Sequence, residues 1–404
     1  MLQKGIQNKL YLSKGIVLLS LVFFFSATSC RITRNVPENE YLLDNANLTI
    51  ETNEKKPGVK ERELQNYIKQ KPNKRVLLFR LHLRMYNLAR KGKEKGFSKL
   101  LRTIGEEPVL LDTLQTNQSA NNLDRYINSK GYYDATVSHT TDIKGERATV
   151  NYKITMGDPY RIKRVNYVIE DTLIRNIVLN DTVNSLISVG SRFDTDLLRK
   201  ERIRIEKRLK EDGYFLFSRD FITFTADTSL GKKMVDLDLV IKDRFIRTEF
   251  GDRIPQPYRK HEITSVFIYT GYDPVEYYHL EEEQLLDTVL FDDQKFIFSF
   301  SPGIKYKTIS DANLIRPGQI YSESVVQKTR DNLNSLRLYR AVNVFFRPDE
   351  EAERIARLEE NFLMFDDKGL TDSPPMGKLN CHIQLTPHTL QSYQFDLVGT
   401  NTAS

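Results

Sequence analysis

Residues that could do acid–base or metal chemistry are scattered along this chain of 404 residues. Its six histidines include no pair at the helical spacing of a metal site, and it has no glycine-rich phosphate loop. The densest acidic runs are Asp292-Asp293 and Glu281-Glu282-Glu283. Acid–base catalysis needs carboxylates that converge in a pocket, so we interpret these runs as solvated charge. We expect no catalytic residue, no bound metal, no cofactor and therefore no enzyme.

Cys30 is the residue whose surroundings most clearly indicate chemistry. It follows a basic stretch with Lys4, Lys9 and Lys14, then a short apolar run at residues 16–25. Four small residues, Ser26-Ala27-Thr28-Ser29, come directly before it. The apolar run is too short to span a bilayer comfortably, which favours cleavage. This order is typical of a bacterial lipoprotein signal, in which the cysteine is acylated and becomes the new N-terminus. Ala27 departs from the leucine that is most common there, and an ordinary signal peptide followed by a chance cysteine is the alternative.

The second cysteine, Cys381, lies in a segment that alternates between apolar and polar residues. Leu379, Ile383 and Leu385 share its apolar face. Alternation with a period of two is the pattern of a strand with one buried face, so Cys381 is predicted to be a buried free thiol.

Charge and length limit the class of protein. The chain has 60 basic and 54 acidic residues, and three of the lysines lie in the signal-like segment. This near balance gives no reason to expect nucleic acid as a partner. The length fits about two to three domains of ordinary size.

The elements that would position a functional surface come as a repeat. Gly190 and Gly318 each open a phrase in which an aromatic residue and an arginine recur at the same offsets: Phe193 and Arg202, Tyr321 and Arg330. Apolar residues at helical spacing lie between them, and an aromatic–apolar strand is predicted at 213–217 and at 338–342. A fainter copy spans 123–137. Such self-similarity indicates tandem small modules, which usually bind other molecules and seldom catalyse.

Each module is predicted to begin with a strand whose alternation is broken once. The residues that show the break are, in the first module, Leu43, Ala46 and Leu48; in the second, Ile162, Val165 and Tyr167; and in the third, Ile263, Val266 and Ile268. The change of spacing from three to two indicates a bulge. The closing strands alternate without a break over 148–154, 235–241 and 379–385, so one face of each sheet is covered by the helices of its own module. The predicted fold class is α+β, built from β-α-α-β-β modules.

These patterns divide the chain. We predict a signal peptide over 1–29, a tether over 30–40, and modules over 41–158, 159–245 and 261–389. A proline-rich linker, 246–260, separates the second and third modules. Insertions interrupt the first module at 73–110 and the third at 272–305.

The insertion at 73–110 is the most basic part of the chain. From Asn73 to Gly105 its only acidic residue is Glu94, against basic residues that include Arg80, Arg84, Arg90, Lys91 and Lys95. Its apolar residues at helical spacing are Leu77, Leu78, Leu81, Met85 and Leu88. Such a helix could touch anionic headgroups or an acidic partner. Core-facing stripes are more common, so we favour a helix that packs on its own module and exposes a basic face.

The modules resemble POTRA domains, the periplasmic arms of Omp85-type outer-membrane proteins. The likeness is to the BamA/TamA branch and, within it, to the lipidated TamL-like members. It is carried by the Gly-x-x-Phe/Tyr and Gly-Tyr-Phe phrases, Cys30, and the segments Val36–Leu43, Ile104–Val109 and Gln391–Asn401. Residues 390–404 are similar to the family's first barrel strand, and they suffice for one spanning strand of about 9–11 residues. The family's membrane-insertion activity is therefore not expected of this chain on its own.

The resemblance implies a non-enzymatic scaffold that is lipid-anchored to the outer membrane, with its modules facing the periplasm. It implies unfolded outer-membrane proteins as clients and a TamB-like protein as partner. An extended peptide would add to an exposed sheet edge, because main-chain hydrogen bonds tolerate many sequences. The predicted edges are the strands around 214–224 and 340–346, with the candidate residues Tyr214, Phe217, Phe221, Thr223, Tyr339, Val342 and Val344.

Two alternatives remain open. The arm of a two-partner-secretion-type transporter would use the same modules for one dedicated client. An exported enzyme on a small α+β scaffold would need one module to differ from the others in its polar groups, which the repeat disfavours.

Overall fold

The structure, a computed structural model, describes residues 32–55, 57–76, 79–89, 96–229, 231–247, 251–272, 287–298, 304–355 and 375–388. Two compact units divide the chain: residues 1–162 with 190–196 and 230–235, and the remainder. Among the described residues no helix is both long and apolar enough to cross a membrane. The predicted signal peptide, Cys30 and the expected strand at 390–404 lie outside the described residues.

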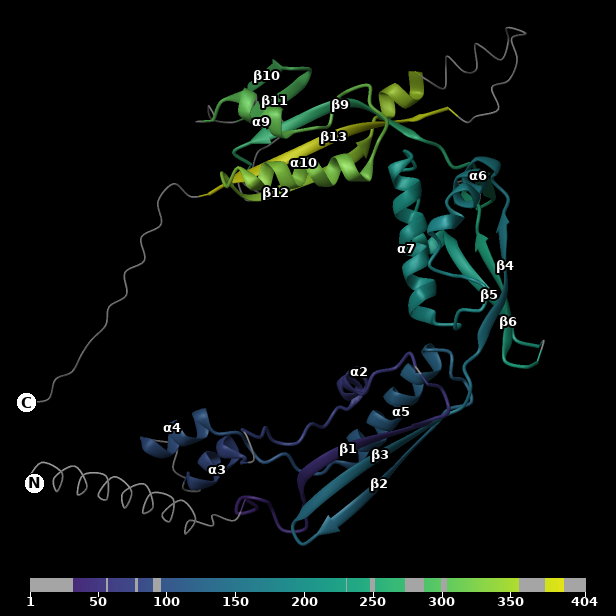
Figure 1. Cartoon of the computed structure of the whole chain (residues 1–404). Coiled ribbons are helices and arrows are strands. Elements are labelled where there is room, and N and C mark those ends of the chain that lie inside the picture. The colour runs from purple at the N-terminus through teal and green to yellow at the C-terminus, as the bar shows by residue number, and fades with distance from the viewer. Residues whose placement is uncertain are drawn as a thin grey trace, which may run out of the picture. The chain divides into compact units, whose positions relative to one another are not determined.

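The first module is a three-stranded sheet with helices on one face (Figure 1). β1 (Leu42–Thr52) runs parallel to β3 (Arg147–Met156), and β2 (Thr136–Lys144) pairs antiparallel with the other side of β3. The cover consists of α2 (Glu61–Leu64), the 3-10 turn η1 (Gln65–Tyr67) and α5 (Thr113–Ser129). Its core includes Leu123 and Ile127 of α5 and Val150 and Ile154 of β3. The insertion carries α3 (Leu81–Leu88) and α4 (Phe97–Ile104).

The second module repeats this order. β4 (Arg161–Ile169) and β5 (Ile222–Asp227) flank β6 (Met234–Ile241). Between them come α6 (Thr172–Asn180), the 3-10 turn η2 (Thr182–Asn184), α7 (Thr195–Glu211) and the 3-10 turn η3 (Arg219–Phe221). The predicted linker contains part of a small antiparallel pair, β7 (Arg244–Arg247) with β8 (Arg253–Gln256).

The third module has five strands in the order β10-β11-β9-β13-β12. The module's own strands are β9 (His261–Thr270), β12 (Tyr339–Pro348) and β13 (Gly377–Pro387), and its helices are α9 (Tyr306–Ala312) and α10 (Glu323–Ser335). The insertion at 272–305 supplies β10 (Asp287–Phe291) and β11 (Gln294–Phe298). Each module thus has the β-α-α-β-β order and the α+β fold that were predicted.

The predicted bulges are present in the first and third modules. β1 skips Asp44 in its pairing with β3, and β9 skips Thr264 in its pairing with β13. The closing strands alternate as expected. Cys381 is a fully buried free thiol, and burial raises the pKa of that thiol.

The prediction of a strand at 213–217 is wrong. β5 begins at Ile222, and the residues before it form a turn that ends in η3. Tyr214 and Phe217 are each only 2% exposed, and the Phe217 ring packs against Phe221 and Tyr258. Because these side chains fill the core of the second module, their apolar character reflects burial and not a strand.

Candidate functional site: open strand edges

The three sheets end in strands whose outer side has no partner among the described residues. β2, β5 and β12 each close one side of a sheet, as Figure 1 shows. An edge strand presents N–H and C=O groups that can pair with another chain. β12 has 10 residues, β2 has 9 and β5 has 6. β12 therefore offers the longest of these three edges.

The register of β12 decides which of its amides face outward. Asp349 N donates to Lys378 O at 2.9 Å, and hydrogen-bonded pairs of an antiparallel ladder recur at every second residue. The amides of Val342, Val344 and Phe346 consequently face the open edge. Val344 is buried at 7% exposure, and Val342 packs on the same core. These two predicted residues can therefore pair with a client through their main-chain groups but not through their side chains. Tyr339, which begins β12, is also buried.

A stack of rings and cations crosses the face of this sheet opposite the core. His382 of β13 lies between Phe267 of β9 and Phe345 of β12, with ring centroids 5.1 Å apart on each side. Lys295 lies over the Phe267 ring at 4.9 Å and Arg347 over the Phe345 ring at 5.4 Å. Cross-strand aromatic and cation–π pairs of this kind stabilise a sheet and stiffen it. The stack ends on β12, at the open edge.

The surroundings of His382 favour its neutral form. Burial, reinforced by the charge of Arg347, lowers the pKa of His382, and its Nδ1 lies 3.0 Å from the Tyr269 hydroxyl. The alternation that puts Cys381 on the apolar face puts His382 on the polar face, and the structure agrees, but the alternation alone does not indicate the stack of rings. The signal was present in β9, where Phe267 and Tyr269 occupy the positions that the alternation assigns to the polar face.

The other side of the same sheet is already extended by the chain itself. β11 runs parallel to β9 and pairs Lys295, Phe296 and Ile297 with Phe267, Ile268 and Tyr269. β10 then folds back on β11. In the other two sheets the corresponding strands, β1 and β4, lie at the edge. The third module therefore contains one added hairpin and one open edge.

The candidate residues predicted in the second module are less well placed to pair with a client strand. Only Thr223 is within β5, and Phe221 ends the turn before it. Lys242 N donates to Phe221 O at 2.9 Å, so by the same alternation the amide of Thr223 points inward, to Val240. The amides of Phe224 and Ala226 face outward instead. The edge at β2, mostly exposed, was missed, although the faint third copy of the repeat leads into it.

The repeat builds the same backbone contacts at two module junctions. At the first, Tyr160 N donates to Gly131 O at 2.8 Å and Phe193 N donates to Tyr160 O at 2.9 Å. At the second, His261 N donates to Gly213 O at 2.9 Å and Tyr321 N donates to His261 O at 2.8 Å. Gly131 and Gly213 have φ of 92° and 100°, the left-handed conformation in which a glycine commonly follows the end of a helix.

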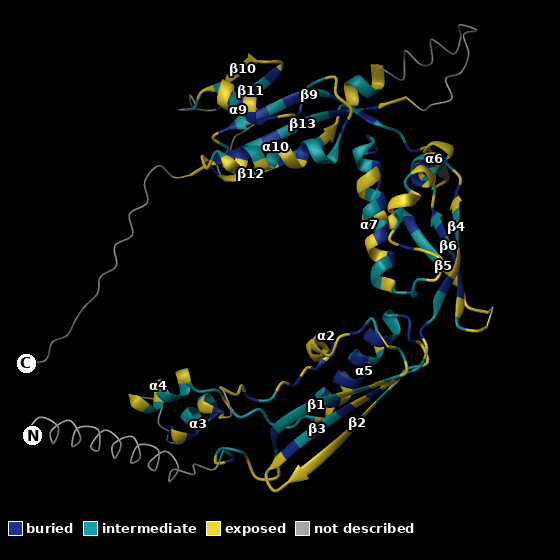
Figure 2. Ribbon diagram, viewed as in Figure 1, coloured by how far each residue is buried: buried dark blue, intermediate teal, exposed yellow. Residues whose placement is uncertain are grey.

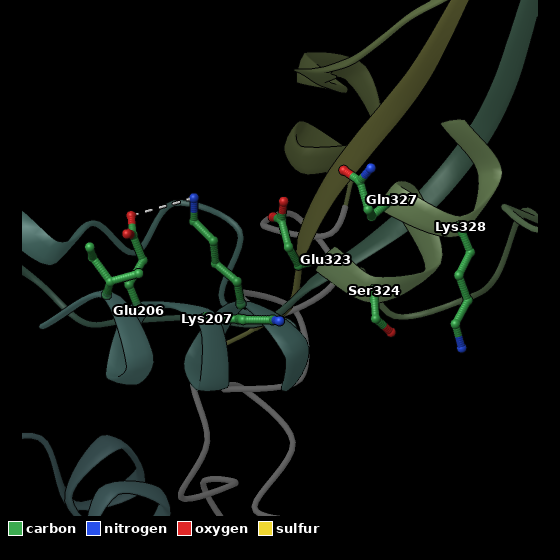
Figure 3. Close-up of a pocket in the computed structure, with 8 residues that line it drawn as sticks. Glu206, Lys207, Glu323, Ser324, Gln327 and Lys328 are labelled. Atoms are coloured by element: carbon green, nitrogen blue, oxygen red, sulfur yellow. Dashed lines mark ion pairs between the residues drawn. The ribbon is translucent and has the colours of Figure 1, made fainter. Parts of the chain in front are cut away.

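A shallow hollow of about 440 Å³ lies between α7 and α10 beside the second junction (Figure 3). Its lining consists of Ile203, Glu206, Lys207, Lys210, Glu323, Ser324, Gln327 and Lys328. All of these residues are half-buried or exposed, and both signs of charge alternate, with Lys210 paired to Glu206 at 3.6 Å. A ligand pocket buries most of the surface of its ligand, and a hollow lined by exposed and half-buried charged side chains does not offer that enclosure.

The basic insertion packs on its module through only some of its residues. Arg80 is buried, and its guanidinium donates to the side chain and the carbonyl of Asp44 at the bulge of β1. Arg84 lies over the Phe79 ring at 5.2 Å. The apolar residues predicted to pack on the module are not the ones that do so. Leu81 and Leu88 are 44% and 51% exposed, whereas Leu83 is buried. Arg90, Lys91 and Lys95 lie outside the described residues.

Comparison with known proteins gives similarity of structure only. No family profile and no curated protein sequence matches the chain. The POTRA3-5 region of BamA from Haemophilus influenzae is 13% identical, with 87% of this chain and 99% of that chain covered and a TM-score of 0.38. The POTRA1-3 region of Omp85 from Anabaena is 11% identical, with 86% and 96% covered and a TM-score of 0.24. CdiB from Escherichia coli is 8% identical, with 51% and 28% covered and a TM-score of 0.21. The α+β fold with the order β-α-α-β-β is therefore established by the element order and strand register of each module.

Proposed function

We propose that this chain is the periplasmic POTRA arm of an outer-membrane protein assembly or translocation factor, TamL-like, and that it acts by binding and not by catalysis. An acyl group on Cys30 attaches it to the outer membrane. Its clients are unfolded outer-membrane proteins, and a TamB-like protein is its partner. The binding mode is addition of an extended segment to an open sheet edge.

The observation that carries this proposal is the edge at β12. It has 10 residues, outward amides at Val342, Val344 and Phe346, and a stiff stack of rings behind it. A rigid edge loses little conformational entropy when a client strand is added, so more of the main-chain hydrogen-bond energy appears as affinity. The hairpin β10–β11 supports the same mode, because it is an extended segment that already pairs with the opposite side of this sheet.

Site-specific crosslinking in the full chain tests the proposal. A photoreactive residue at Asn343, which is exposed on β12, should form adducts with unfolded outer-membrane proteins. The same residue at Thr141 of β2 and at Ala226 of β5 reports on the edges at those two strands. If none of the three positions yields an adduct while the chain is folded and present with its client, edge addition at β12, β5 and β2 is wrong.

A proline at an outward amide sharpens the test. Val342→Pro removes an N–H that has no partner in the ladder, so the module should remain folded while client adducts at Asn343 fall. Ala341→Pro is the matched control: by the same alternation it removes an N–H that β13 uses, and it leaves Asn343 free for the photoreactive residue. Equal client crosslinking in folded Val342→Pro and in the unmodified chain would argue against main-chain pairing at β12.

A further inference from the structure

α4 presents its apolar residues to solvent. Phe97, Leu100 and Ile104 follow one another at helical spacing and are 73%, 52% and 47% exposed. Figure 2 shows much of this helix in the exposed colour. Leu81 and Leu88 of α3 are also about half exposed. A contiguous apolar stripe of this kind on a folded module is an interaction surface more often than an accident of composition.

The charge around this stripe indicates the kind of surface to which the stripe binds. Between Asn73 and Gly105 a single acidic residue stands against ten basic ones, and Lys99 lies on α4 itself. Apolar residues beside lysines and arginines match the interface of a bilayer with anionic headgroups, where the apolar side enters the acyl boundary and the basic side contacts phosphate.

The start of the described chain lies against the same insertion. Asn87 of α3, which is 1% exposed, donates from Nδ2 to the carbonyl of Ile32 at 2.6 Å. Thr33 is 9% exposed, and Val36 N donates to Thr33 O at 3.0 Å to close a turn. The predicted tether at 30–40 therefore contacts the insertion at Ile32. A lipid attached at Cys30 would be separated from Ile32 by two residues, about 7 Å of chain.

We propose that α3 and α4 form a membrane-docking element, in which Phe97, Leu100 and Ile104 insert into the interface of an anionic bilayer beside the Cys30 anchor. α4 is one short helix and binds a bilayer weakly by itself. The anchor raises its effective concentration at the surface, so the helix sets the orientation of the first module and not the membrane attachment. The inference rests on the membrane-attached location proposed above and is independent of strand addition at β12.

The chain contains no tryptophan, so a single tryptophan reports on one position. We would place Phe97→Trp in the full, acylated chain and reconstitute it in vesicles of phosphatidylethanolamine and phosphatidylglycerol. Its emission should shift to the blue, and lipids brominated on the acyl chains should quench it. Val183→Trp is the matched control, because Val183 is 87% exposed on η2, and its emission should not respond.

Two further variants separate the contribution of charge to membrane binding from that of the lipid anchor. With Cys30→Ser, which removes acylation, the Phe97→Trp chain should still respond to anionic vesicles, and adding Lys99→Gln should weaken that binding about fivefold. Unchanged tryptophan emission from the acylated Phe97→Trp chain in vesicles would overturn the proposal, and crosslinking at β12 would be unaffected by that result. A blue shift that depends on protein concentration without lipid would also overturn it, because the stripe would then bind a second copy of the chain.

Discussion

The two module junctions share a backbone and differ in chemistry. In both, a glycine with positive φ follows a helix, and its carbonyl accepts a hydrogen bond from the residue that begins the next module's first strand or immediately precedes it. An aromatic residue two positions later packs on that strand: Tyr133 on Tyr160 at the first, Phe215 on His261 at the second. The side chains beside this frame differ. Lysine–aspartate ion pairs lie beside the first junction. A buried histidine, a carboxylate that accepts hydrogen bonds from a serine, and the ion pair Arg259–Glu353 lie beside the second.

The first junction uses opposite charges. Lys130 pairs with Asp194 at 3.2 Å and with Asp196 at 2.7 Å, and Lys233 pairs with Asp134 at 3.1 Å. At the second, Glu211 accepts hydrogen bonds from the amide and hydroxyl of Ser324. Burial alone would raise the pKa of Glu211, but these bonds, with that of Ser322, outweigh it and lower the pKa. The backbone geometry is thus the same at both junctions, and we expect each junction to respond to a different solution condition.

The largest expected effect is acid sensitivity of the second junction. His261 is 2% exposed, and burial, reinforced by the charge of Arg259, lowers its pKa to about 4. The unfolded chain binds the proton first as the pH falls, so the stabilisation is complete above pH 6.5, the ordinary pKa, and is lost toward about pH 4. We expect a loss of up to about 3 kcal/mol over this window.

Hydrogen exchange over this pH range, corrected for the intrinsic rate, measures that loss. Peptides around His261 should lose protection, and those around Tyr160 should not, because tyrosine does not titrate there. His261→Phe should flatten the response of the second junction. Equal loss at both junctions would show that their chemistry does not distinguish them.

The next effect in size comes from the shared glycines. A Cβ at Gly131 would lie 2.9 Å from the carbonyl oxygen of Phe193, and one at Gly213 would lie 2.6 Å from the Cγ2 methyl of Ile320. Positive φ costs about 1–2 kcal/mol for a residue with a Cβ, and the backbone oxygen is harder to move than a side-chain methyl. We expect Gly131→Val to lower the free energy of unfolding more than Gly213→Val.

A substitution at Gly145 measures backbone strain without steric crowding of the added side chain. It has a φ of 60° and no atom within 4 Å of an added Cβ, so Gly145→Val reports the cost of the backbone alone. Denaturant unfolding of the three variants gives the ranking. If Gly145→Val were as destabilising as Gly131→Val, close packing at the first junction would not contribute.

The smallest effect is that of salt on the first junction. Lys130→Met removes two ion pairs that are partly shielded from solvent, and we expect a loss of about 1 kcal/mol at low ionic strength. The loss should shrink as salt screens the pairs in the parent chain. Glu211→Gln at the second junction should show little dependence on salt. A salt-independent effect of Lys130→Met would mean that its packing over the Tyr126 ring, at 5.4 Å, matters more than its charge.

Much of this fold could be predicted from periodicity, because a two-residue alternation directly encodes one buried face. The closing strands, the bulges at Asp44 and Thr264 and the burial of Cys381 all follow from it. Tyr214 and Phe217 could not be placed, because an aromatic run fills a core in a turn as well as in a strand. The outward amides of β12 depend on register, and the contact of Asn87 with Ile32 joins distant segments; neither leaves a local signal in the sequence.

The central claim is that clients add as a strand to β12, and residue-resolved hydrogen exchange of the full chain tests it most directly. The probe is an extended peptide from a strand of an outer-membrane protein. The amides of Val342, Val344 and Phe346 should exchange quickly in the free chain and become protected when the peptide binds, while those of Asn343 and Phe345 are already protected by β13. Protection that alternates in this way is the result we predict. Binding of the peptide with no change at Val342, Val344 and Phe346 would contradict the account.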